Sequence, residues 1–349
     1  MRSGTVNSEQ RPAISVCIAN YNGRHVIERC VDSVLRQQCS ADFEVIVFDD
    51  ASADGSHTLV ARRFPSIRLL SVSNNGGYCR ANNAMADAAR GDYLLLLNND
   101  AWLEHGALEA LWQAALAKPQ AILSLRQLDA ATGEVRDYGM GLDFLFVPFP
   151  LERARSAQLV SVMGACLWTP RALFFEARRF PEWFDSIAED LYLCLFARFR
   201  SADVRLITTH SYYHHAGHSF GGGEQASRQL STTYVRRRLS ERNRFALLLS
   251  FLPSGLVLPL AAGVLFSWAL ESVALSATTR SLAPCRRIYL AALRDVWMRR
   301  QAIWELRCYV QGKRLTRFRD FLAPLRPTPV KLAFLLRHGV PRLRSPGHP

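Results

Sequence analysis

One stretch constrains the fold more than any other: the apolar run from Tyr93 to Leu97, which leads through two asparagines into Asp100. A run without polar alternation is typical of a strand buried on both faces, in a mainly parallel sheet covered by helices. In open α/β sheets, ligands bind beyond the carboxyl ends of the strands. The sequence therefore places the Asp100 carboxylate where a ligand, or a metal bound to one, would sit. The alternative is that Asp100 caps the next helix.

Three more apolar runs in the first hundred residues end in Asn, Asp or Gly; they are Ile14–Ala19, Glu44–Phe48 and Ile67–Val72. Helical patterns lie between and after the strands, over His25–Gln37, Ser56–Arg63, Tyr78–Ala89 and Ala107–Lys118. Regular alternation of strand and helix predicts βαβ units and a parallel sheet, so the expected fold class is α/β.

The strand ends differ in chemistry. Tyr21 offers a flat face for stacking, Asp49 an acceptor for a ring N–H, and Asp100 a hard oxygen ligand for Mg²⁺ or Mn²⁺. A base, a ribose and a diphosphate laid along one sheet edge need these three groups. The chain has no G-x-x-x-x-G-K-[ST] and no G-x-G-x-x-G, which disfavours a P-loop and a classical dinucleotide site.

The second half of the site is expected after residue 150. Val160–Trp168 has a strand-like pattern, and small residues at its centre leave room for a close approach. Glu189 and Asp190 then begin a helical run; the alternative is that they only complement the helix dipole. Farther on, three histidines at 214, 215 and 218 lie beside four glycines, a composition that predicts a metal or phosphate role for at least one of them.

In this order, the motifs resemble the family 2 glycosyltransferases, which have the GT-A fold, and within them the rhamnosyltransferase-like branch that builds bacterial surface polysaccharides. The resemblance runs from about Ile14 to Ser219. The motifs are Ala19–Gly23, Asp49–Ser56, Asn75–Gly77 with Asn82 and Asn83, Gly91–Asp100, Met163–Ala165, Glu189 with Asp190, and His215 with Gly217 and Ser219.

On the donor side, the resemblance implies that Tyr21 stacks on the nucleotide base and that Asp49 hydrogen-bonds it. Asp100 closes the motif that the family writes as D-x-D or N-x-D, and would hold Mg²⁺ or Mn²⁺ on the donor diphosphate. The remaining donor-side and metal-side positions that the resemblance implies are Asn20, Gly77 and Asn83 for the donor, and His215 and His218 for the metal or diphosphate.

On the acceptor side, Asp190 matches the family's catalytic base and Glu189 stands beside it. Inverting transfer needs one base and no protein acid, because a metal-bound diphosphate leaves without protonation. A glycoside hydrolase would need two carboxylates flanking the bond. Where the family usually has another acid two residues later, this chain has Tyr192. The implied donor is a nucleotide-sugar, with dTDP-rhamnose favoured by the resemblance alone.

The C-terminal part differs sharply in charge. Residues 231–349 hold 21 Lys and Arg against 5 Asp and Glu, whereas residues 1–230 hold 22 against 25. Within that basic part, Phe245–Leu270 has no charged residue and is long enough to cross a bilayer. Basic residues flank it on both sides, which favours a re-entrant or surface-lying segment over a single span.

Farther on, aromatic and aliphatic residues recur at helical spacing among arginines around Trp297. This pattern predicts an interfacial helix on anionic lipid, or alternatively a helix packed on the catalytic domain.

We therefore expect a disordered N-terminus over 1–12, a GT-A domain over 13–230 and a basic helical, membrane-associated region over 231–349. Residues 1–10 are polar and lack a signal-peptide pattern, which predicts a location on the cytoplasmic face of the bacterial inner membrane. The expected partners are a nucleotide-sugar, a glycan or glycolipid acceptor and an anionic membrane, with no nucleic acid.

Two alternative functions are a sugar nucleotidyltransferase, which would carry a basic glycine-rich loop after its first strand, and a non-enzymatic membrane or nucleic-acid adaptor.

Overall fold

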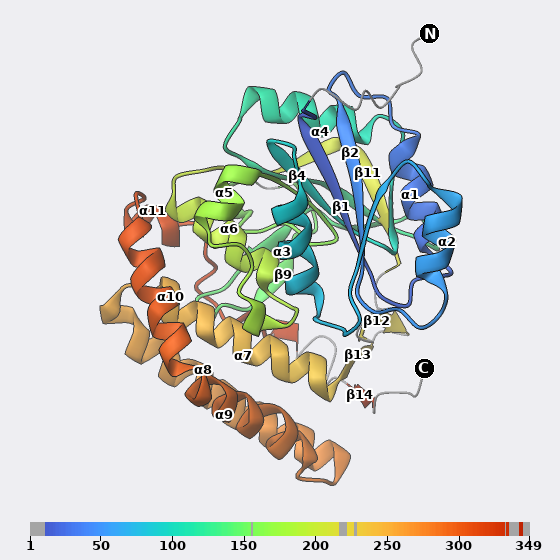
Figure 1. Cartoon of the computed structure of the whole chain (residues 1–349). Helices are drawn as coiled ribbons and strands as arrows, with labels where there is room; N and C mark the ends of the chain where they lie inside the picture. Colours follow the sequence, from blue (N-terminus) through green and yellow to red (C-terminus); the bar gives the residue numbers. More distant parts are fainter. Residues whose placement is uncertain are drawn as a thin grey trace. The chain divides into compact units, whose positions relative to one another are not determined.

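The computed structural model describes residues 11–154, 156–215, 222–226, 229–331, 333–334 and 342–344. The chain divides into two compact units (Figure 1). The first comprises Met1–Met140 and Pro150–His215, and the second comprises Gly141–Phe149 and Ala216–Pro349. Each unit is described by itself below.

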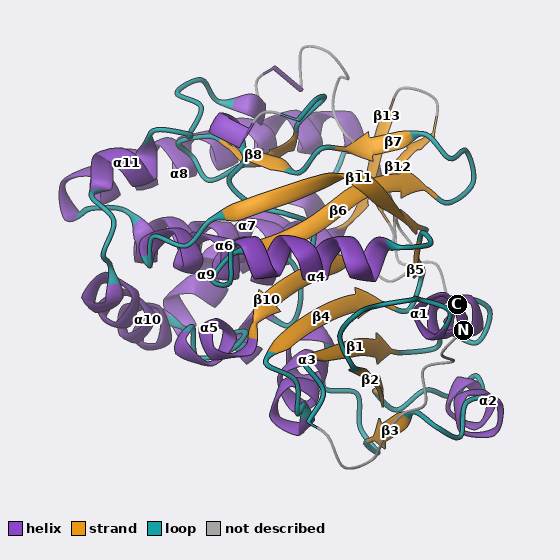
Figure 2. Cartoon of the chain, turned by 90° about the horizontal axis from the view of Figure 1, so that it is seen from above, coloured by secondary structure: helices purple, strands orange, loops and turns teal. Residues whose placement is uncertain are grey.

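A 9-stranded sheet forms the centre of the first unit in the part of the chain that the structure describes (Figure 2). Its order is β3-β2-β1-β4-β10-β6-β11-β5, with β7 paired to β6. The strands are β1 (Ile14–Asn20), β2 (Phe43–Asp49), β3 (Arg68–Ser71), β4 (Tyr93–Asn98), β5 (Ala101–Leu103), β6 (Ile122–Asp129), β7 (Val135–Asp137), β10 (Cys166–Pro170) and β11 (Val204–His214).

The first four strands pair in parallel, as the alternating pattern predicts. Beyond β4 the sheet is mixed, because β10 runs antiparallel between β4 and β6. In β1, Val16 and Ile18 face one hydrophobic core and Cys17 faces the other way, yet all three are fully buried. Helices therefore cover both faces, and the predicted α/β fold class is confirmed.

The helices of this unit begin and end close to the predicted positions. Helices α1, α2 and α4 share one hydrophobic core with alternate residues of β1, β2, β4 and β6, and α3 packs against β1 and β2. The bounds are α1 (Ile27–Leu35), α2 (Ser56–Arg63), α3 (Tyr78–Ala88), α4 (Ala107–Ala117), α5 (Arg171–Glu176) and α6 (Glu189–Phe199), with short 3₁₀ turns η1 (Ser156–Gln158) and η2 (Glu182–Phe184).

These bounds decide two predictions, one on the strand over Val160–Trp168 and one on Asp100 as a helix cap. The strand expected over Val160–Trp168 begins only at Cys166, because the preceding residues form a loop that contacts the start of α6. Asp100 does not cap the next helix, since α4 begins at Ala107 and its N-cap is Gly106, whose φ is +78°. Asp100 is therefore left at the end of β4 without a capping role.

The second unit is mainly helical. A short ladder of β8 (Met140–Leu142) with β9 (Pro148–Pro150) lies where the two units meet in sequence, and β12 (Gly222–Ala226), β13 (Gln229–Thr233) and β14 (Arg342–Arg344) form a small sheet. The helices are α7 (Tyr234–Phe251), α8 (Ser254–Thr279), the π-helix η3 (Cys285–Leu290), α9 (Ala291–Met298), α10 (Arg300–Lys313) and α11 (Phe318–Leu322). The apolar stretch predicted over Phe245–Leu270 is broken at Pro253, which starts α8.

Helix α8 is, within the described residues, the one helix long and apolar enough to cross a membrane by length and composition. Its mean hydropathy is 1.8 over its most apolar stretch, of which 17% is buried. A core helix of a soluble protein would be mostly buried, so α8 is apolar on a face that this unit does not cover.

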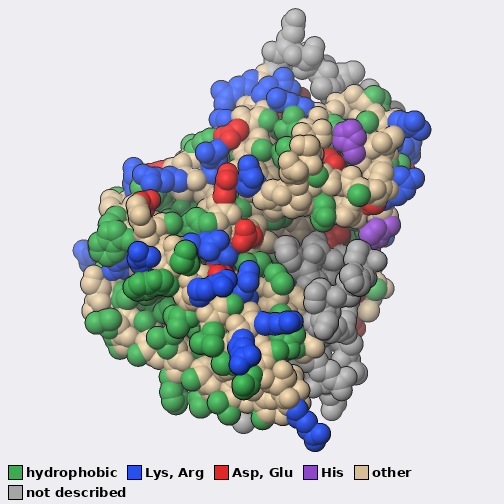
Figure 3. All heavy atoms as spheres, turned by 60° about the horizontal axis from the view of Figure 1, so that its bottom comes forward, with side chains coloured by type: hydrophobic (Ala, Val, Ile, Leu, Met, Phe, Trp, Pro, Cys, Tyr) green, Lys and Arg blue, Asp and Glu red, His purple; other side chains and the backbone are tan. Residues whose placement is uncertain are grey.

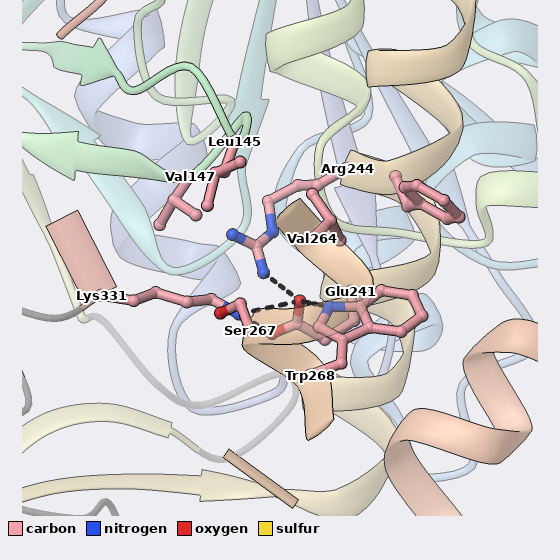
Figure 4. A pocket seen from close by; sticks show the side chains of 9 residues that line it. Leu145, Val147, Glu241, Arg244, Val264, Ser267, Trp268 and Lys331 are labelled. Carbon is pink, nitrogen blue, oxygen red and sulfur yellow. Dashed lines mark hydrogen bonds and ion pairs between the residues drawn. The ribbon is translucent and has the colours of Figure 1, made fainter. Parts of the chain in front are cut away.

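A buried ion cluster joins α7 to α8 and to Lys331. Glu241 on α7 accepts hydrogen bonds from Trp268 Nε1 (2.7 Å) and Lys331 Nζ (2.9 Å). Arg244 Nη2 lies 2.6 Å from the same carboxylate, and Arg237 Nε lies 2.9 Å from it. Figure 4 shows Glu241, Arg244, Trp268 and Lys331 converging at one end of a small pocket. One carboxylate thus pairs with three cationic side chains, those of Arg237, Arg244 and Lys331.

Glu241→Gln is expected to destabilise the chain by about 3–5 kcal/mol, because removing one partner of a buried ion cluster leaves the others uncompensated. Burial by itself would raise the pKa of Glu241, but the charges of Arg244, Lys331 and Arg237 outweigh burial and lower it. The stabilisation is therefore present above the ordinary glutamate pKa and is lost as the pH falls through and below it.

Chemical denaturation of wild type and variant between neutral and acidic pH would measure both effects. Glu305→Gln is the matched control, because Glu305 is an exposed glutamate on α10. An E241Q protein as stable as wild type at neutral pH would contradict a stabilising role for the cluster.

Candidate active site

The tips of the first parallel strands are joined by the side chain of Asn20. Its Nδ2 donates to Asp49 Oδ1 (2.8 Å) and Ser56 Oγ (2.9 Å), and its Oδ1 accepts from Asn99 Nδ2 (2.9 Å). Gly23 passes so close that a Cβ there would lie 2.2 Å from Asn99 Nδ2. Asn20, predicted to bind the donor, is buried and fixes the geometry of three strand ends.

Tyr21 and Asp49 differ in how open they are to a ligand. The Tyr21 side chain is 54% exposed, so its ring is free to stack on a planar group. Asp49 is buried, and its Oδ2 accepts from the Ser52 backbone N–H (3.1 Å) while Oδ1 accepts from Asn20. Each carboxylate oxygen retains a second lone pair, and base recognition by Asp49 stays a prediction.

The loop before α3 is held by Asp50, which the sequence reading did not single out. Its two carboxylate oxygens accept hydrogen bonds from the backbone N–H groups of Gly76 (2.8 Å) and Gly77 (2.9 Å). Gly77 has a φ of +84°, a conformation that favours glycine. No local pattern marks Asp50 as the partner of this turn, because the two glycines lie 26 and 27 residues later in the chain.

Asn83 has a structural contact. Its Nδ2 donates to the Phe180 carbonyl (2.9 Å), and the Phe180 N–H donates back to Asn83 Oδ1 (3.0 Å). The side chain is buried. These bonds join α3 to the segment before α6, and the donor-binding role of Asn83 stays a prediction to which the contact lends no support.

Asp100 lies at the carboxyl end of β4, as predicted, and it meets a histidine there. Strand β5 pairs antiparallel with the end of β11, with Ala101 opposite His214. His214 Nε2 consequently lies 3.1 Å from Asp100 Oδ1, and both side chains are buried. The Asp100 carbonyl accepts from the His215 N–H (3.1 Å). This strand pairing thus brings a potential second ligand to the carboxylate.

The histidine beside Asp100 is His214, whereas the predicted metal ligands are His215 and His218, whose roles stay predictions. The His215 ring packs on Trp102, with ring centroids 5.2 Å apart, and His218 lies outside the described residues. His214 is one of the three histidines for which a metal or phosphate role is predicted. Only the pairing of β11 with β5 places it beside Asp100.

The surroundings of Asp100 fit a divalent cation. Asp100 Oδ1, Asn98 Oδ1 and His214 Nδ1 are buried and receive no well-formed hydrogen bond within the described part of the chain. Buried polar atoms are normally paired, so such a group indicates a ligand. Mg²⁺ is typically held by one or two carboxylates together with substrate phosphates. In the described ranges no cluster of three His, Cys, Asp or Glu could hold a metal, so a cation here would need further ligands, such as a diphosphate.

The predicted acceptor-side acids lie in the first turn of α6. Asp190 Oδ2 accepts from the Gly164 N–H (2.9 Å), and a Cβ at Gly164 would be 3.4 Å from that carboxylate oxygen. The neighbouring Ala165 carbonyl accepts from the Asn98 N–H at the end of β4 (3.0 Å). A single short segment therefore connects Asp190 to the strand end that carries Asp100.

A buried tyrosine of β11, Tyr212, has acidic groups around it that include Asp137. The pKa of Tyr212 is raised well above its ordinary value, first by burial and then by nearby acidic groups that include Asp190 and Asp100. At neutral pH the phenol of Tyr212 therefore stays protonated.

The backbone before Glu189 is strained. Asp185, Ile187 and Ala188 have φ values of +61°, +73° and +71°. Such values cost of order 1–3 kcal/mol per residue and cluster at functional sites. The Asp185 carbonyl accepts from the Cys79 N–H (3.2 Å) at the start of α3. This contact anchors the strained loop to the helix that follows the Asp50-held turn.

Tyr78 supports the same segment. Its hydroxyl donates to the Gly164 carbonyl (3.1 Å), while the Gly164 N–H holds Asp190. Tyr78 is partly buried, and burial, followed by the charges of Glu189 and Asp190, raises its pKa well above the ordinary value. Tyr78 therefore stays protonated at neutral pH and keeps the hydrogen that it donates to Gly164.

Tyr78→Phe is expected to lower kcat about 3- to 10-fold with little change in the donor KM, because Asp190 loses the fixed position of its backbone partner. The loss of one hydrogen bond should cost about 0.5–1.5 kcal/mol of stability. Steady-state kinetics and denaturation would measure both. Tyr93→Phe, at the opposite end of β4, is the control; an unchanged kcat in Y78F would show that the contact does not position Asp190.

Three comparisons with known proteins bear on this site. Residues 15–177 match the family described as Glycosyl transferase family 2. This part of the chain is therefore a domain of that family. The match confirms the predicted family for these residues and the glycosyltransferase class, whereas the rhamnosyltransferase-like branch stays a prediction.

A relative by sequence is a chondroitin synthase of Pasteurella multocida, 37% identical over 101 residues, which are 28% of this chain and 10% of the relative. The chain spans about a third or less of the length of the first curated relatives that it matches.

Solved structures share the fold. The structure of S. aureus TarS 1-349 in complex with UDP-GlcNAc has a TM-score of 0.55 at 16% identity, and the match covers 89% of each chain. The structure of GalNAc-T7 with UDP, GalNAc and Mn²⁺ has a TM-score of 0.54 at 14% identity, covering 78% of this chain and 58% of the other. At these identities the likeness shows the GT-A fold of the family 2 domain.

Proposed function

We propose that the protein is an inverting, metal-dependent glycosyltransferase that moves a sugar from a nucleotide-sugar to a glycan or lipid-linked acceptor. The observation that supports this proposal most strongly is the pairing of Asp100 with His214 at the end of β4, beside the segment that holds Asp190. In this proposal Asp100 serves the donor diphosphate, and Asp190, on α6, serves the acceptor.

Each residue then has a defined task. Tyr21 stacks on the nucleotide base, and Asn20 and Asp50 keep the strand ends and the Gly76–Gly77 turn in place. Asp100 and His214 would hold a Mg²⁺ or Mn²⁺ ion, which neutralises charge on the leaving diphosphate when bound.

Asp190 accepts the proton of the acceptor hydroxyl while the oxygen forms a bond to the anomeric carbon. The bond from that carbon to the diphosphate oxygen breaks, and the nucleoside diphosphate leaves with the electron pair. The Gly164 N–H holds the Asp190 carboxylate for this step, and Glu189 lies buried in the same helical turn.

The proposal also names candidate donors, the kind of acceptor and the cellular location of the enzyme. UDP-sugars are candidate donors because the TarS structure was solved with UDP-GlcNAc, and dTDP-rhamnose is a candidate from the family resemblance. The acceptor is proposed to be lipid-linked because the second unit carries an apolar helix and a strongly basic sequence. The location that we propose is the cytoplasmic face of the bacterial inner membrane.

A panel of nucleotide-sugars tests the donor side. Full-length protein is mixed with UDP-, dTDP- and GDP-sugars, with Mg²⁺, with Mn²⁺ or with a chelator, and its thermal unfolding is recorded. A ligand at about 100 times its Kd should stabilise the fold by about 2.7 kcal/mol. Stabilisation that requires the metal, together with release of nucleoside diphosphate when an acceptor is supplied, would support the proposal. No response to any donor would overturn it, and release of pyrophosphate from a nucleoside triphosphate would indicate a nucleotidyltransferase.

A further inference from the structure

One face of α8 is fixed within the second unit. Val264, Trp268, Ser272 and Leu275 are buried, and their spacing places them on one side of the helix. Trp268 donates to Glu241, as described above.

Glu271 adds a second polar attachment on the same side. It accepts from Tyr289 Oη (2.9 Å), and Lys331 Nζ lies 2.7 Å from its carboxylate. It also forms an ion pair with Arg237 of α7. Polar groups of three segments therefore hold this side of α8 in place.

The opposite face of α8 is apolar and uncovered in the described structure. Leu258, Phe266, Leu270 and Val273 are between 57% and 80% exposed. Their spacing of eight, four and three residues places them on one stripe. Contiguous exposed apolar surface of this kind indicates an interaction site.

The next helical segments continue the pattern. The large exposed hydrophobic residues of η3, α9 and α10 include Leu290, Leu293, Trp297 and Trp304. Exposed arginines lie among them and after α8, at positions 280, 286, 287, 294 and 300. Figure 3 shows a face of the molecule on which hydrophobic side chains gather among those of Lys and Arg.

We propose that these residues form a monotopic docking surface, on which α8 lies in the plane of an anionic lipid bilayer and does not cross it. Tryptophan and leucine side chains would enter the interface, and the arginines would meet acidic headgroups, the combination typical of in-plane helices. The inference specifies how the membrane partner proposed above is bound.

The ion cluster argues against a span. If α8 crossed the bilayer, the charged residues attached to it, Arg237, Glu241 and Lys331, would be carried to membrane depth with it. Charged side chains there are costly and rare. An in-plane α8 leaves the cluster on the protein side and turns only the apolar stripe toward lipid.

Vesicle binding of the full chain tests the surface. The protein should sediment with vesicles of phosphatidylcholine containing about one-third phosphatidylglycerol, and much less with phosphatidylcholine alone, because basic residues need anionic lipid. Phe266→Glu combined with Val273→Glu should weaken partitioning at least tenfold with unchanged circular dichroism. Leu116→Glu, at an exposed leucine of α4 in the first unit, is the matched control. Equal binding of the double variant and wild type would overturn the proposal.

Labelling of introduced cysteines distinguishes an α8 that lies in the plane of the bilayer from an α8 that crosses it. In a Cys308→Ser background, Gly255→Cys and Ser281→Cys place thiols at the two ends of α8. A membrane-impermeant maleimide added outside vesicles should label both from the same side; labelling from opposite sides would mean a span and overturn the proposal.

A last outcome concerns self-association. A different outcome is that the wild-type protein fails to bind vesicles and forms dimers that the double variant does not form. In that case the exposed apolar face of α8 is an interface between copies of the chain, and the proposal is wrong. Donor-dependent thermal stabilisation, measured on the same samples, reports on the family 2 domain and separates failure of this inference from failure of the proposed transferase activity.

Discussion

Asp190→Asn is expected to lower kcat for sugar transfer by about 10²–10⁴-fold, the range contributed by a positioned general base. The amide cannot accept the proton of an acceptor hydroxyl, but it keeps an oxygen that can accept the Gly164 N–H, so the loop should stay in place. Donor binding should be nearly unchanged. Product formation and donor-induced thermal stabilisation would be measured side by side.

Glu182→Gln provides the matched control for Asp190, because Glu182 is an exposed acid on η2, before the strained loop. It should transfer sugar at close to the wild-type rate. If Asp190→Asn lost donor binding together with transfer, Asp190 would belong to the donor site and its assignment as the base would be wrong.

Asp100→Asn is expected to weaken metal-dependent donor binding by at least 10–100-fold, the loss seen even when groups around a metal ligand are removed. The amide preserves the shape of the buried side chain but not its charge. Binding of the donor in a chelator should change little, because the base and ribose contacts do not involve Asp100. Titration calorimetry with and without Mn²⁺ would measure metal-dependent and metal-independent donor binding separately.

Asp92→Asn is the matched control for Asp100, since Asp92 immediately precedes β4 and its exposed carboxylate is bound to Arg11. His214→Ala should lower metal-dependent binding in the same direction, whereas His215→Ala should have a smaller effect because its ring packs on Trp102. The reverse order of these two histidines would show that the observed pairing is not the metal-binding one.

The strand ends could be predicted because each depends on local pattern. The order of strands and helices follows from the alternating strand and helix patterns along the chain. The burial of β4 follows from its uninterrupted run of apolar residues, and Asp100 comes shortly after that strand. The position of Asp190 at the start of α6 is likewise local, since two acids precede a helical run.

What could not be predicted depends on contacts between distant segments. The position of His214 beside Asp100 comes from the antiparallel pairing of β5 with β11, and nothing near residue 214 specifies the partner strand. The Gly76 and Gly77 N–H groups are held by Asp50, twenty-six residues away, and Asn83 pairs with Phe180 across a still longer separation. The antiparallel β10 was also not foreseen, because Val160–Trp168 is as apolar as a strand while only its last residues pair.

The amino-acid sequence alone thus determined the α/β class, the family 2 motifs and the charge difference between the two parts of the chain, because these properties are carried by runs of neighbouring residues. Only the tertiary structure decided that Asp100 meets His214, that Asp190 is held by Gly164 next to β4, and that α8 has one side attached to Glu241 and another side bare. Each of these facts depends on a strand pairing or helix packing that brings together groups more than twenty residues apart, and such pairings are selected by the burial of the whole core and not by local sequence.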